Sequence, residues 1–89
     1  AVSGEVAVAM AEAARNQLGC DIGVGITGVA GPSDMDGVTV GQVFIGIASQ
    51  SGSTSTSMRF PPNRPILKRR AVTQALLQIY HRILETDQN

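Results

Sequence analysis

One glycine-rich stretch and one cluster of basic residues are the parts of this sequence whose types and spacing point to chemistry. In residues 26–32, an apolar run passes into Thr27, Gly28, Gly31 and Pro32. Such loops bring backbone N–H groups close to an anionic ligand, and α/β sheets place their ligands at the carboxyl ends of strands. The stretch therefore predicts a loop with the option of an anion site, to which the Thr27 hydroxyl can add one hydrogen bond.

The basic cluster lies in the first two turns of an expected helix and consists of Arg64, Lys68, Arg69 and Arg70. Cations at a helix N-terminus oppose the helix dipole, which favours anions there. Two interpretations stay open. A phosphate can be held by the helix N-terminus and the added arginines, or the cluster is a solvated basic face that pairs with the acidic part of the chain. Residues 1–36 carry a net charge of −4 and residues 37–89 a net charge of +4.

Four further features that could suggest a functional site are better explained as ordinary structure. The G-x-G-x-x-G run at residues 23–28 lies inside an expected strand, whereas a dinucleotide-binding fingerprint needs the strand before its first glycine and a helix after it. Asp34 and Asp36 lack the other ligands of an EF-hand, so we expect a turn there. No base lies near Cys20 in the sequence, and we expect it to be a small core residue. We expect His81 at the rim of a helix's apolar face.

Composition excludes several classes of function. Seven Lys+Arg balance seven Asp+Glu, and aromatic residues make up only 3% of the chain, whereas a general nucleic-acid binder has a basic excess and aromatic side chains for stacking. No apolar run approaches the roughly 18–20 residues of a membrane span, and no metal-ligand spacing is present. With a single cysteine and no expected signal peptide, the sequence predicts a cytoplasmic protein that does not attach to membranes.

Two helices and three strands must position these residues. The expected elements are a helix over residues 4–18, strands over residues 21–27, 40–48 and 53–60, and a second helix that begins after Asn63. Ser3 suits the N-cap of the first helix, and Gly19 suits its C-terminal end. The middle strand is almost continuously apolar and is expected at the centre of the sheet, whereas the third, rich in Ser and Thr, suits an edge. The order is α-β-β-β-α.

The second helix carries an expected apolar stripe about six turns long, followed by a polar tail over residues 85–89. The stripe consists of Ile66, Leu67, Ala71, Val72, Ala75, Leu76, Ile79, Tyr80 and Ile83. Three strands form a thin sheet, which predicts missing neighbours. The chain also begins without Met and enters a helix almost at once, so we expect it to be a piece of a longer polypeptide.

A set of short motifs carries a resemblance to one known family. They are AVS-x-EVA at residues 1–7, LG-x-DIG at 18–23, TGVAGP at 27–32, VG-x-VFIG at 40–46, FP-x-NR at 60–64 and RRA at 69–71. Together they cover essentially the whole chain. The sequence resembles the C-terminal domain of the CinA family of competence/damage-inducible proteins, whose stand-alone versions are nicotinamide mononucleotide deamidases.

The resemblance implies a bacterial, cytoplasmic domain of three-layer α/β type with a mixed sheet. It implies hydrolysis of the carboxamide of nicotinamide mononucleotide to nicotinic acid mononucleotide and ammonia, with no metal or other cofactor. The proposed serine nucleophile and lysine base of the family lie in E-S-C-T-G-G and Y-x-N-x-x-K motifs upstream of the matched region. Neither motif occurs here. We therefore expect a single, truncated domain without catalytic residues of its own.

The resemblance also assigns binding residues. Thr27, Gly28, Gly31 and Pro32 correspond to the loop of the substrate pocket, and Arg64 and Arg69 are candidates to meet the substrate phosphate. Two departures stand out: residues 33–39 are shorter than the family's loop and lack its G-G-x…K-P pattern, and Pro62-Asn63 replaces G-D ahead of the arginine. Lys68 belongs to the arginine-rich helix and does not correspond to the catalytic lysine.

Three functions stay open at this point. The first is one half of a nucleotide amidase, which binds nicotinamide mononucleotide or a related nucleotide and needs the upstream half of the same domain. The second is a non-catalytic nucleotide-binding or oligomerisation module that pairs with another copy through an open sheet edge. The third, a role with nucleic acid, rests only on the basic cluster and the family's name, and we expect no nucleic-acid partner.

Overall fold

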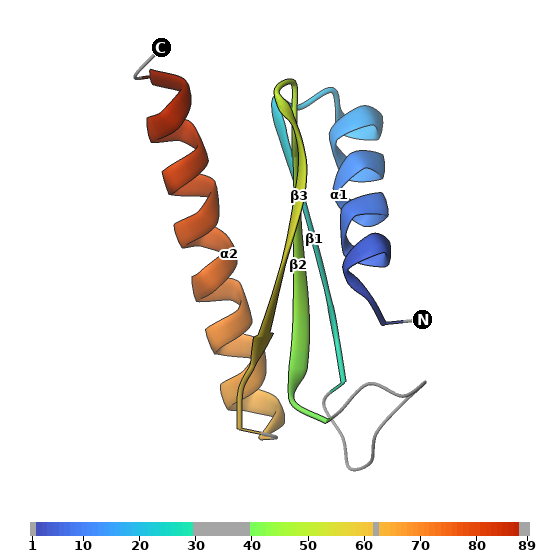
Figure 1. The fold of residues 1–89 in the computed structure, drawn as a ribbon, viewed down its shortest axis with the longest axis vertical. Helices are drawn as coiled ribbons and strands as arrows, with labels where there is room; N and C mark the ends of the chain where they lie inside the picture. Colours follow the sequence, from blue (N-terminus) through green and yellow to red (C-terminus); the bar gives the residue numbers. More distant parts are fainter. Residues whose placement is uncertain (1, 30–39, 62, 88–89) are drawn as a thin grey trace.

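The computed structural model describes residues 2–29, 40–61 and 63–87 and arranges them in three layers. The elements are α1 (Gly4–Leu18), β1 (Ile22–Gly28), β2 (Gln42–Ser49), β3 (Gly52–Arg59) and α2 (Arg64–Asp87). A three-stranded sheet lies in the middle, with α1 on one face and α2 on the other (Figure 1). The expected order α-β-β-β-α is confirmed, and each strand lies within two residues of its expected position.

The sheet has the order β1-β2-β3, and both pairs are antiparallel. The mixed sheet that the family resemblance implies is therefore not present in the three strands of this chain. β2 is central because its side chains are apolar on both sides, and β3 is the polar edge that the sequence predicts. β1 forms the other edge.

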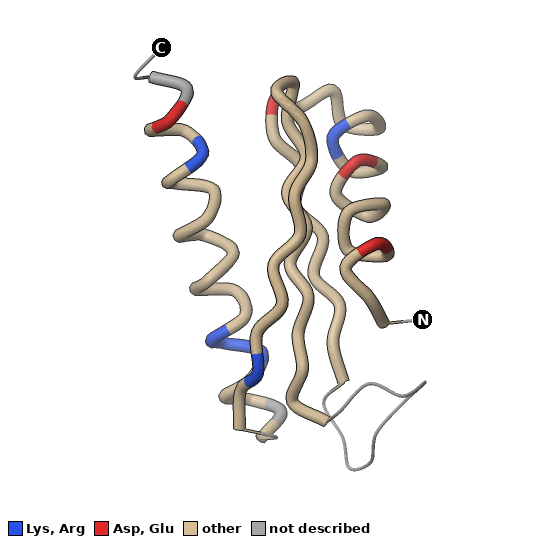
Figure 2. Tube along the Cα trace, viewed as in Figure 1, with Lys and Arg blue, Asp and Glu red and all other residues tan. Residues whose placement is uncertain are grey.

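Basic residues are concentrated at one end of the fold. Glu5 and Glu12 lie on α1, and Asp21 precedes β1 at the upper end of the molecule (Figure 2). Arg59 and the basic residues of the first turns of α2 gather at the opposite end (Figure 2). The separation of charge along the sequence is only partly a separation in space, because Arg15 shares α1 with the two glutamates and Arg82 lies near Glu85 in the last turns of α2.

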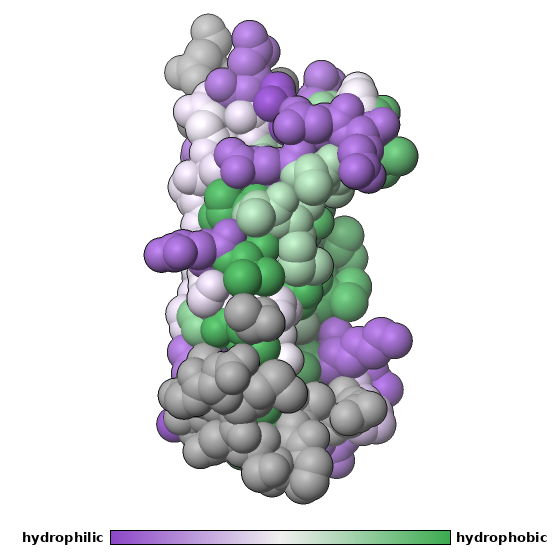
Figure 3. Space-filling view, turned by 90° about the vertical axis from the view of Figure 1, so that its right-hand side faces the viewer, coloured by the Kyte–Doolittle hydropathy of each residue, from purple (hydrophilic) through white to green (hydrophobic). Residues whose placement is uncertain are grey.

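α1 packs its backbone almost directly on the sheet. Ala7 and Ala11 are completely buried, and they lie over glycines of β1 and β2. A Cβ atom at Gly25 or Gly46 would collide with the backbone of Ala7, so only glycine allows this approach. Figure 3 shows the side of the molecule that α1 covers: apolar side chains occupy its middle, and hydrophilic side chains gather at its upper end.

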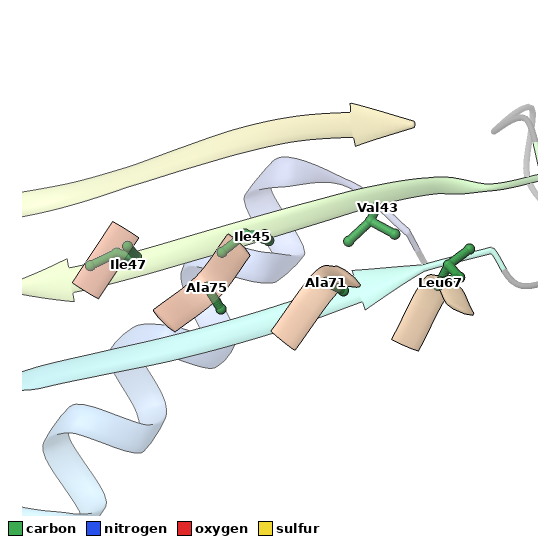
Figure 4. Close-up of a cluster of buried hydrophobic side chains, with 6 residues drawn as sticks. All are labelled: Val43, Ile45, Ile47, Leu67, Ala71 and Ala75. Atoms are coloured by element: carbon green, nitrogen blue, oxygen red, sulfur yellow. The ribbon is translucent and has the colours of Figure 1, made fainter. Parts of the chain in front are cut away.

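α2 packs on the other face through side chains. Val43, Ile45 and Ile47 of β2 meet Leu67, Ala71 and Ala75 of α2 in the main apolar cluster (Figure 4). Ile22, Val24 and Ile26 of β1 are only half-buried at its margin. This face of the sheet is therefore less completely covered than the face under α1.

The apolar residues of α2 do not form the single stripe that the sequence predicts. Leu67, Ala71 and Ala75 are buried, but Val72 and Leu76 are exposed. Toward the end of the helix the sheet-facing positions are instead polar, because β3 presents hydroxyl groups there: Thr56 Oγ1 donates to Gln78 Oε1 over 3.4 Å, and Arg82 Nη2 donates to Thr54 Oγ1 over 2.9 Å.

Local sequence fixes where both helices begin. The Ser3 Oγ accepts a hydrogen bond from the Val6 N–H at 3.1 Å, and the Asn63 Oδ1 accepts one from the Ile66 N–H at 3.3 Å. Gly19 ends α1 in a left-handed conformation with φ 63°. α2 continues to Asp87, so the expectation of a frayed tail is wrong for residues 85–87, and residues 88–89 lie outside the described residues.

The expectation that Cys20 belongs to the core is also wrong, because its side chain is exposed. Gly19 turns the chain away from the helix axis, which leaves Cys20 in the short connection between α1 and β1. Its Sγ contacts only the Leu18 carbonyl oxygen among the hydrogen-bond partners described, at 3.8 Å. His81 is exposed on α2 with its ring 6.1 Å from that of Tyr80, in keeping with the expected place at a helix rim.

Candidate functional site

The sequence-predicted site residues that the structure describes lie at one end of the molecule. The carboxyl end of β1, the start of β2, the end of β3 and the start of α2 all meet there (Figure 1). Thr27 is half-buried near the end of β1, and Gly28, the last residue of the strand, is exposed. Gly31 and Pro32 lie outside the described residues. The strand end therefore holds the first two members of the predicted pocket loop.

The base of this loop is clamped by backbone hydrogen bonds. The Val29 N–H donates to the Gln42 carbonyl at 3.0 Å, and the Gly41 N–H donates back to the Val29 carbonyl at 2.7 Å. The Phe60 N–H donates to the Gly41 carbonyl at 2.9 Å, which ties in the end of β3. Gly41 adopts φ 91°, a conformation that favours glycine, and the Val29 side chain is buried. The loop therefore leaves the sheet from a fixed base.

Positive charge surrounds the start of α2. Arg59 at the end of β3 and Lys68, Arg69 and Arg70 on α2 are exposed (Figure 2). No acidic residue lies in the first turn of the helix. The N-terminal dipole of the helix and the cations therefore act together to attract an anion at this end of the molecule.

The two arginines predicted to meet the phosphate both lie near the start of α2. Arg64 is the first residue of α2. Arg69 is exposed and lies about 160° around the helix from Leu67 and Ala71, which face the sheet. Arg69 thus shares an end of the molecule with Thr27 but stands on the outer side of its helix.

Sequence reasoning missed a polar cleft of about 600 Å³ between β3 and α2. It is lined by hydroxyl-bearing residues of β3, including Thr54 and Thr56, and by Gln74, Gln78 and Arg82 of α2. Arg82 Nη1 donates to Ser49 Oγ at 2.6 Å, at the hairpin between β2 and β3. The spacing of the three α2 residues was a usable signal, since positions four apart share a helix face and this face opposes a Ser/Thr-rich strand.

Neither a metal centre nor a membrane helix is found in the described parts of the chain. Among residues 2–29, 40–61 and 63–87, no three His, Cys, Asp or Glu side chains come together in a way that could hold a metal ion. Within the same ranges, no helix combines the length and apolar character needed to cross a bilayer.

Comparison with known families decides the relationship that the motifs imply. The profile of the CinA C-terminal domain matches residues 1–83. The chain belongs to the CinA C-terminal domain family. The match includes the loop base, the sheet and most of α2, so the site residues described above lie within the matched range.

Curated relatives extend well beyond this chain. It is 42% identical over 81 residues to a protein of Desulforamulus reducens that is named as a competence-damage inducible protein, which covers 91% of the chain and 20% of the relative. It is 42% identical over 76 residues to a CinA-like protein of Frankia casuarinae, which covers 85% of the chain and 18% of the relative. The chain thus spans about a fifth of the length of these CinA relatives.

Solved structures of the CinA superfamily share the fold. A protein from Escherichia coli superimposes with a TM-score of 0.81 at 30% identity, over 89% of this chain and 46% of that one. A protein from Klebsiella pneumoniae superimposes with a TM-score of 0.86 at 25% identity, over 94% of this chain and 53% of that one. The chain therefore corresponds to about half of each solved protein.

Proposed function

We propose that this chain is the substrate-binding part of a nicotinamide-nucleotide amidase. The reaction is hydrolysis of the carboxamide C–N bond of nicotinamide mononucleotide in the cytoplasm, and it gives nicotinic acid mononucleotide and ammonia. Thr27, Gly28, Gly31 and Pro32 contribute to substrate binding, and Arg64 and Arg69 neutralise the phosphate. The serine nucleophile and the lysine base are supplied by the rest of the CinA domain.

The observation that supports this proposal is the convergence at one end of the molecule. The TGVAGP motif begins on a strand end whose base is clamped by Val29 and Gly41, and the basic start of α2 lies at the same end (Figures 1 and 2). A mononucleotide carries its anionic group several ångströms from its reactive amide. It therefore suits a site in which cations and a backbone-lined loop are separate but neighbouring features.

The division of labour follows from what each part contributes to the rate. A bound phosphate positions the amide but does not react, so the arginines contribute mainly to substrate affinity. The nucleophile and its base contribute to the chemical step. This chain alone is therefore expected to bind the nucleotide weakly and to release no ammonia.

The test joins this chain behind the catalytic half of a CinA family member that carries both the E-S-C-T-G-G and Y-x-N-x-x-K motifs. Ammonia release from nicotinamide mononucleotide is then measured by a coupled assay, beside the 89-residue chain alone. The joined protein is expected to turn over and the chain alone is not. Turnover by the chain alone would contradict the proposed division.

The role of Arg69 is tested in the same joined protein with two substrates. Arg69→Ala is expected to raise KM for nicotinamide mononucleotide roughly 10- to 100-fold with little change in kcat, since a charge-assisted hydrogen bond contributes about 1.5–3 kcal/mol. With nicotinamide riboside, which has no phosphate, the substitution is expected to have no effect. Arg70→Ala, a neighbouring exposed arginine, is the matched control. Equal losses with both substrates would refute phosphate recognition by Arg69.

A second candidate function is a non-catalytic nucleotide-binding or oligomerisation module. The exposed apolar side chains of α2, among them Leu76 and Tyr80, favour it because they form a surface for association. The joined protein separates the two candidates: nucleotide binding without any ammonia release, with both catalytic motifs present, would favour the module.

A further inference from the structure

The outer side of α2 carries a second apolar face that stays exposed among the described residues. It consists of Ile66, Val72, Leu76, Leu77, Tyr80, Ile83 and Leu84, each between 38% and 61% exposed. At 100° per residue these side chains fall within an arc of about 140°, on the side of the helix opposite Leu67, Ala71 and Ala75. We call this set the outer face of α2. It is continuous along the helix, unlike the scattered apolar residues of an ordinary surface.

The contrast with the inner side of α2 indicates that the outer face has its own partner. The inner side has Gln74, Gln78 and Arg82 toward its C-terminal half, whereas the outer face keeps Leu76, Tyr80 and Ile83 at the same level. A helix that only covered this sheet would have the reverse arrangement, with its apolar residues inside and its polar residues in water. α2 is patterned to lie between two layers.

The free edge of β1 is a second, independent sign of an absent neighbour. Within the described residues β1 pairs only with β2, and its sequence has no Lys, Pro or bulge of the kind that protects an exposed edge. Its side chains Ile22, Val24 and Ile26 are only half-buried. The other edge, β3, is instead rich in Ser and Thr and ends in Arg59, which suits contact with water.

The comparisons indicate what covers these surfaces. This chain matches 46% of the E. coli protein and 53% of the K. pneumoniae protein, with TM-scores of 0.81 and 0.86. About half of each solved chain therefore lies outside the matched fold. A segment of that size is large enough to supply both a strand beside β1 and a layer over α2, whereas a second copy of this chain would leave the matched halves without their own complement.

We infer that the outer face of α2 and the free edge of β1 are the two contact surfaces for the remaining half of the CinA domain. Apolar side chains of that remaining half pack on Leu76, Tyr80 and Ile83, and an extended segment of it pairs with β1. Arg69 stands in line with Val72 and Leu76 on the same face, so the assembled domain brings the other half against Arg69 as well. The inference rests on the proposed function only in assigning the catalytic groups to that half.

The test mixes the 89-residue chain with the unmatched half of the E. coli relative, produced as a separate polypeptide. Association is measured by sedimentation velocity and native mass spectrometry without substrate. We expect a one-to-one complex, and slower hydrogen exchange at β1 amides within it. Leu76→Ser is expected to weaken the complex at least tenfold. Leu18→Ser is the matched control, because Leu18 is even more exposed, at 75%, but lies on α1, and it is expected to change the affinity less than twofold.

A second measurement covers the case in which the separate half does not stay in solution. This chain replaces the matched part of the intact E. coli relative, and Leu76→Ser is introduced there and in the 89-residue chain. The substitution is expected to lower Tm by about 5 °C in the joined protein, where the side chain is buried, and to leave Tm of the 89-residue chain unchanged.

Three outcomes would overturn the inference. They are a homodimer of this chain that the other half does not displace, a complex that Leu76→Ser leaves at full affinity, and equal Tm shifts in both settings. None of these results depends on ammonia release. A complex that forms as expected but stays inactive would overturn the proposed function and leave the docking surfaces in place.

Discussion

The two faces of the sheet are covered by helices of opposite design. The backbone of α1 lies directly on the strands, because Gly25 and Gly46 have no side chains in the way. α2 contacts the sheet through side chains instead: Val43, Ile45 and Ile47 pack against Leu67, Ala71 and Ala75. A helix that packs directly on glycines has one possible distance from the sheet, and no side chain can be added between them. Contact through side chains can be adjusted.

The two faces of the sheet also differ in how completely they are covered. Under α1 the buried positions are alanines with no exposed surface. The outer side of α1 carries small residues such as Ala9 and Ala13, and the helix exposes only two large apolar side chains, Met10 and Leu18. α2 leaves β1 half-covered and presents large aliphatic side chains outward. A close glycine-mediated contact thus completes a layer, whereas the looser contact leaves a helix available to a further one.

Placing a side chain between α1 and the sheet is expected to have the largest effect. Gly46→Val introduces a Cβ that collides with the Ala7 backbone, so the helix must lift from the sheet. We expect a loss of about 3 kcal/mol or more in the free energy of unfolding, measured by urea denaturation followed by circular dichroism.

Ser57→Val is the control for this substitution. It introduces the same branched side chain at an exposed position of β3 and removes the exposed hydrogen bond from Gln42 Nε2 to Ser57 Oγ at 2.6 Å, so it is expected to change stability by no more than about 1 kcal/mol. If Gly46→Val proved as mild as the control, the close contact of α1 with the sheet would be wrong.

The two sides of α2 are compared by truncating one leucine on each. Leu67→Ala removes a buried side chain from the cluster around Val43 and is expected to destabilise the chain by about 2 kcal/mol. Leu76→Ala removes an exposed side chain and is expected to stay within about 0.5 kcal/mol. Thermal unfolding of both variants is the measurement. Similar losses would show that α2 has no distinct inner and outer side in this chain.

Sequence reasoning predicted the elements well because their signals are local. Ser3 and Gly19 mark the ends of α1, and the apolar run of β2 marks a central strand. The family resemblance, carried by whole motifs, was confirmed by a match over residues 1–83. The inferences about the elements need only residues that are close in the sequence, and each family motif is itself a short run.

What the sequence missed depends on partners that are distant in sequence. The apolar residues of α2 look like one stripe until the polar character of β3 decides which side faces the sheet, since Thr54 and Thr56 lie opposite Arg82 and Gln78. The error at Cys20 has a local cause instead: its residue type favours a core position, but the turn at the neighbouring Gly19 leaves it exposed. Of the predicted pocket, Thr27 and Gly28 are placed at the end of β1, and the assignment of Arg69 to a phosphate stays a prediction.

The polar contacts of Arg82 are expected to contribute less than the apolar cluster. The guanidinium donates to Ser49 Oγ and Thr54 Oγ1 at 2.6 Å and 2.9 Å, and it fastens the C-terminal half of α2 to the β2–β3 hairpin. Arg82→Met keeps the aliphatic stem and is expected to lower stability by about 1 kcal/mol. Hydrogen exchange is expected to quicken after residue 78, whereas Arg70→Met, at an exposed position, is expected to leave exchange there unchanged. Uniform change along α2 would argue against a local fastening.

The helix caps should give the smallest effects, and they compare the two helices once more. Ser3→Ala removes the 3.1 Å bond to the Val6 N–H at a half-buried cap and is expected to lower stability by slightly under 1 kcal/mol. Asn63→Ala removes a longer, exposed bond of 3.3 Å to the Ile66 N–H, and it leaves a helix whose first turns are already opposed by Lys68 and Arg69. We expect about 0.5 kcal/mol at low salt. Salt screens the repulsion between the cations and the helix dipole. Adding salt should therefore stabilise α2 in both the parent and Asn63→Ala, but leave the stability difference between the parent and Ser3→Ala unchanged.

A salt response confined to Ser3→Ala would show that the unfavourable electrostatics lie on α1 and not on α2.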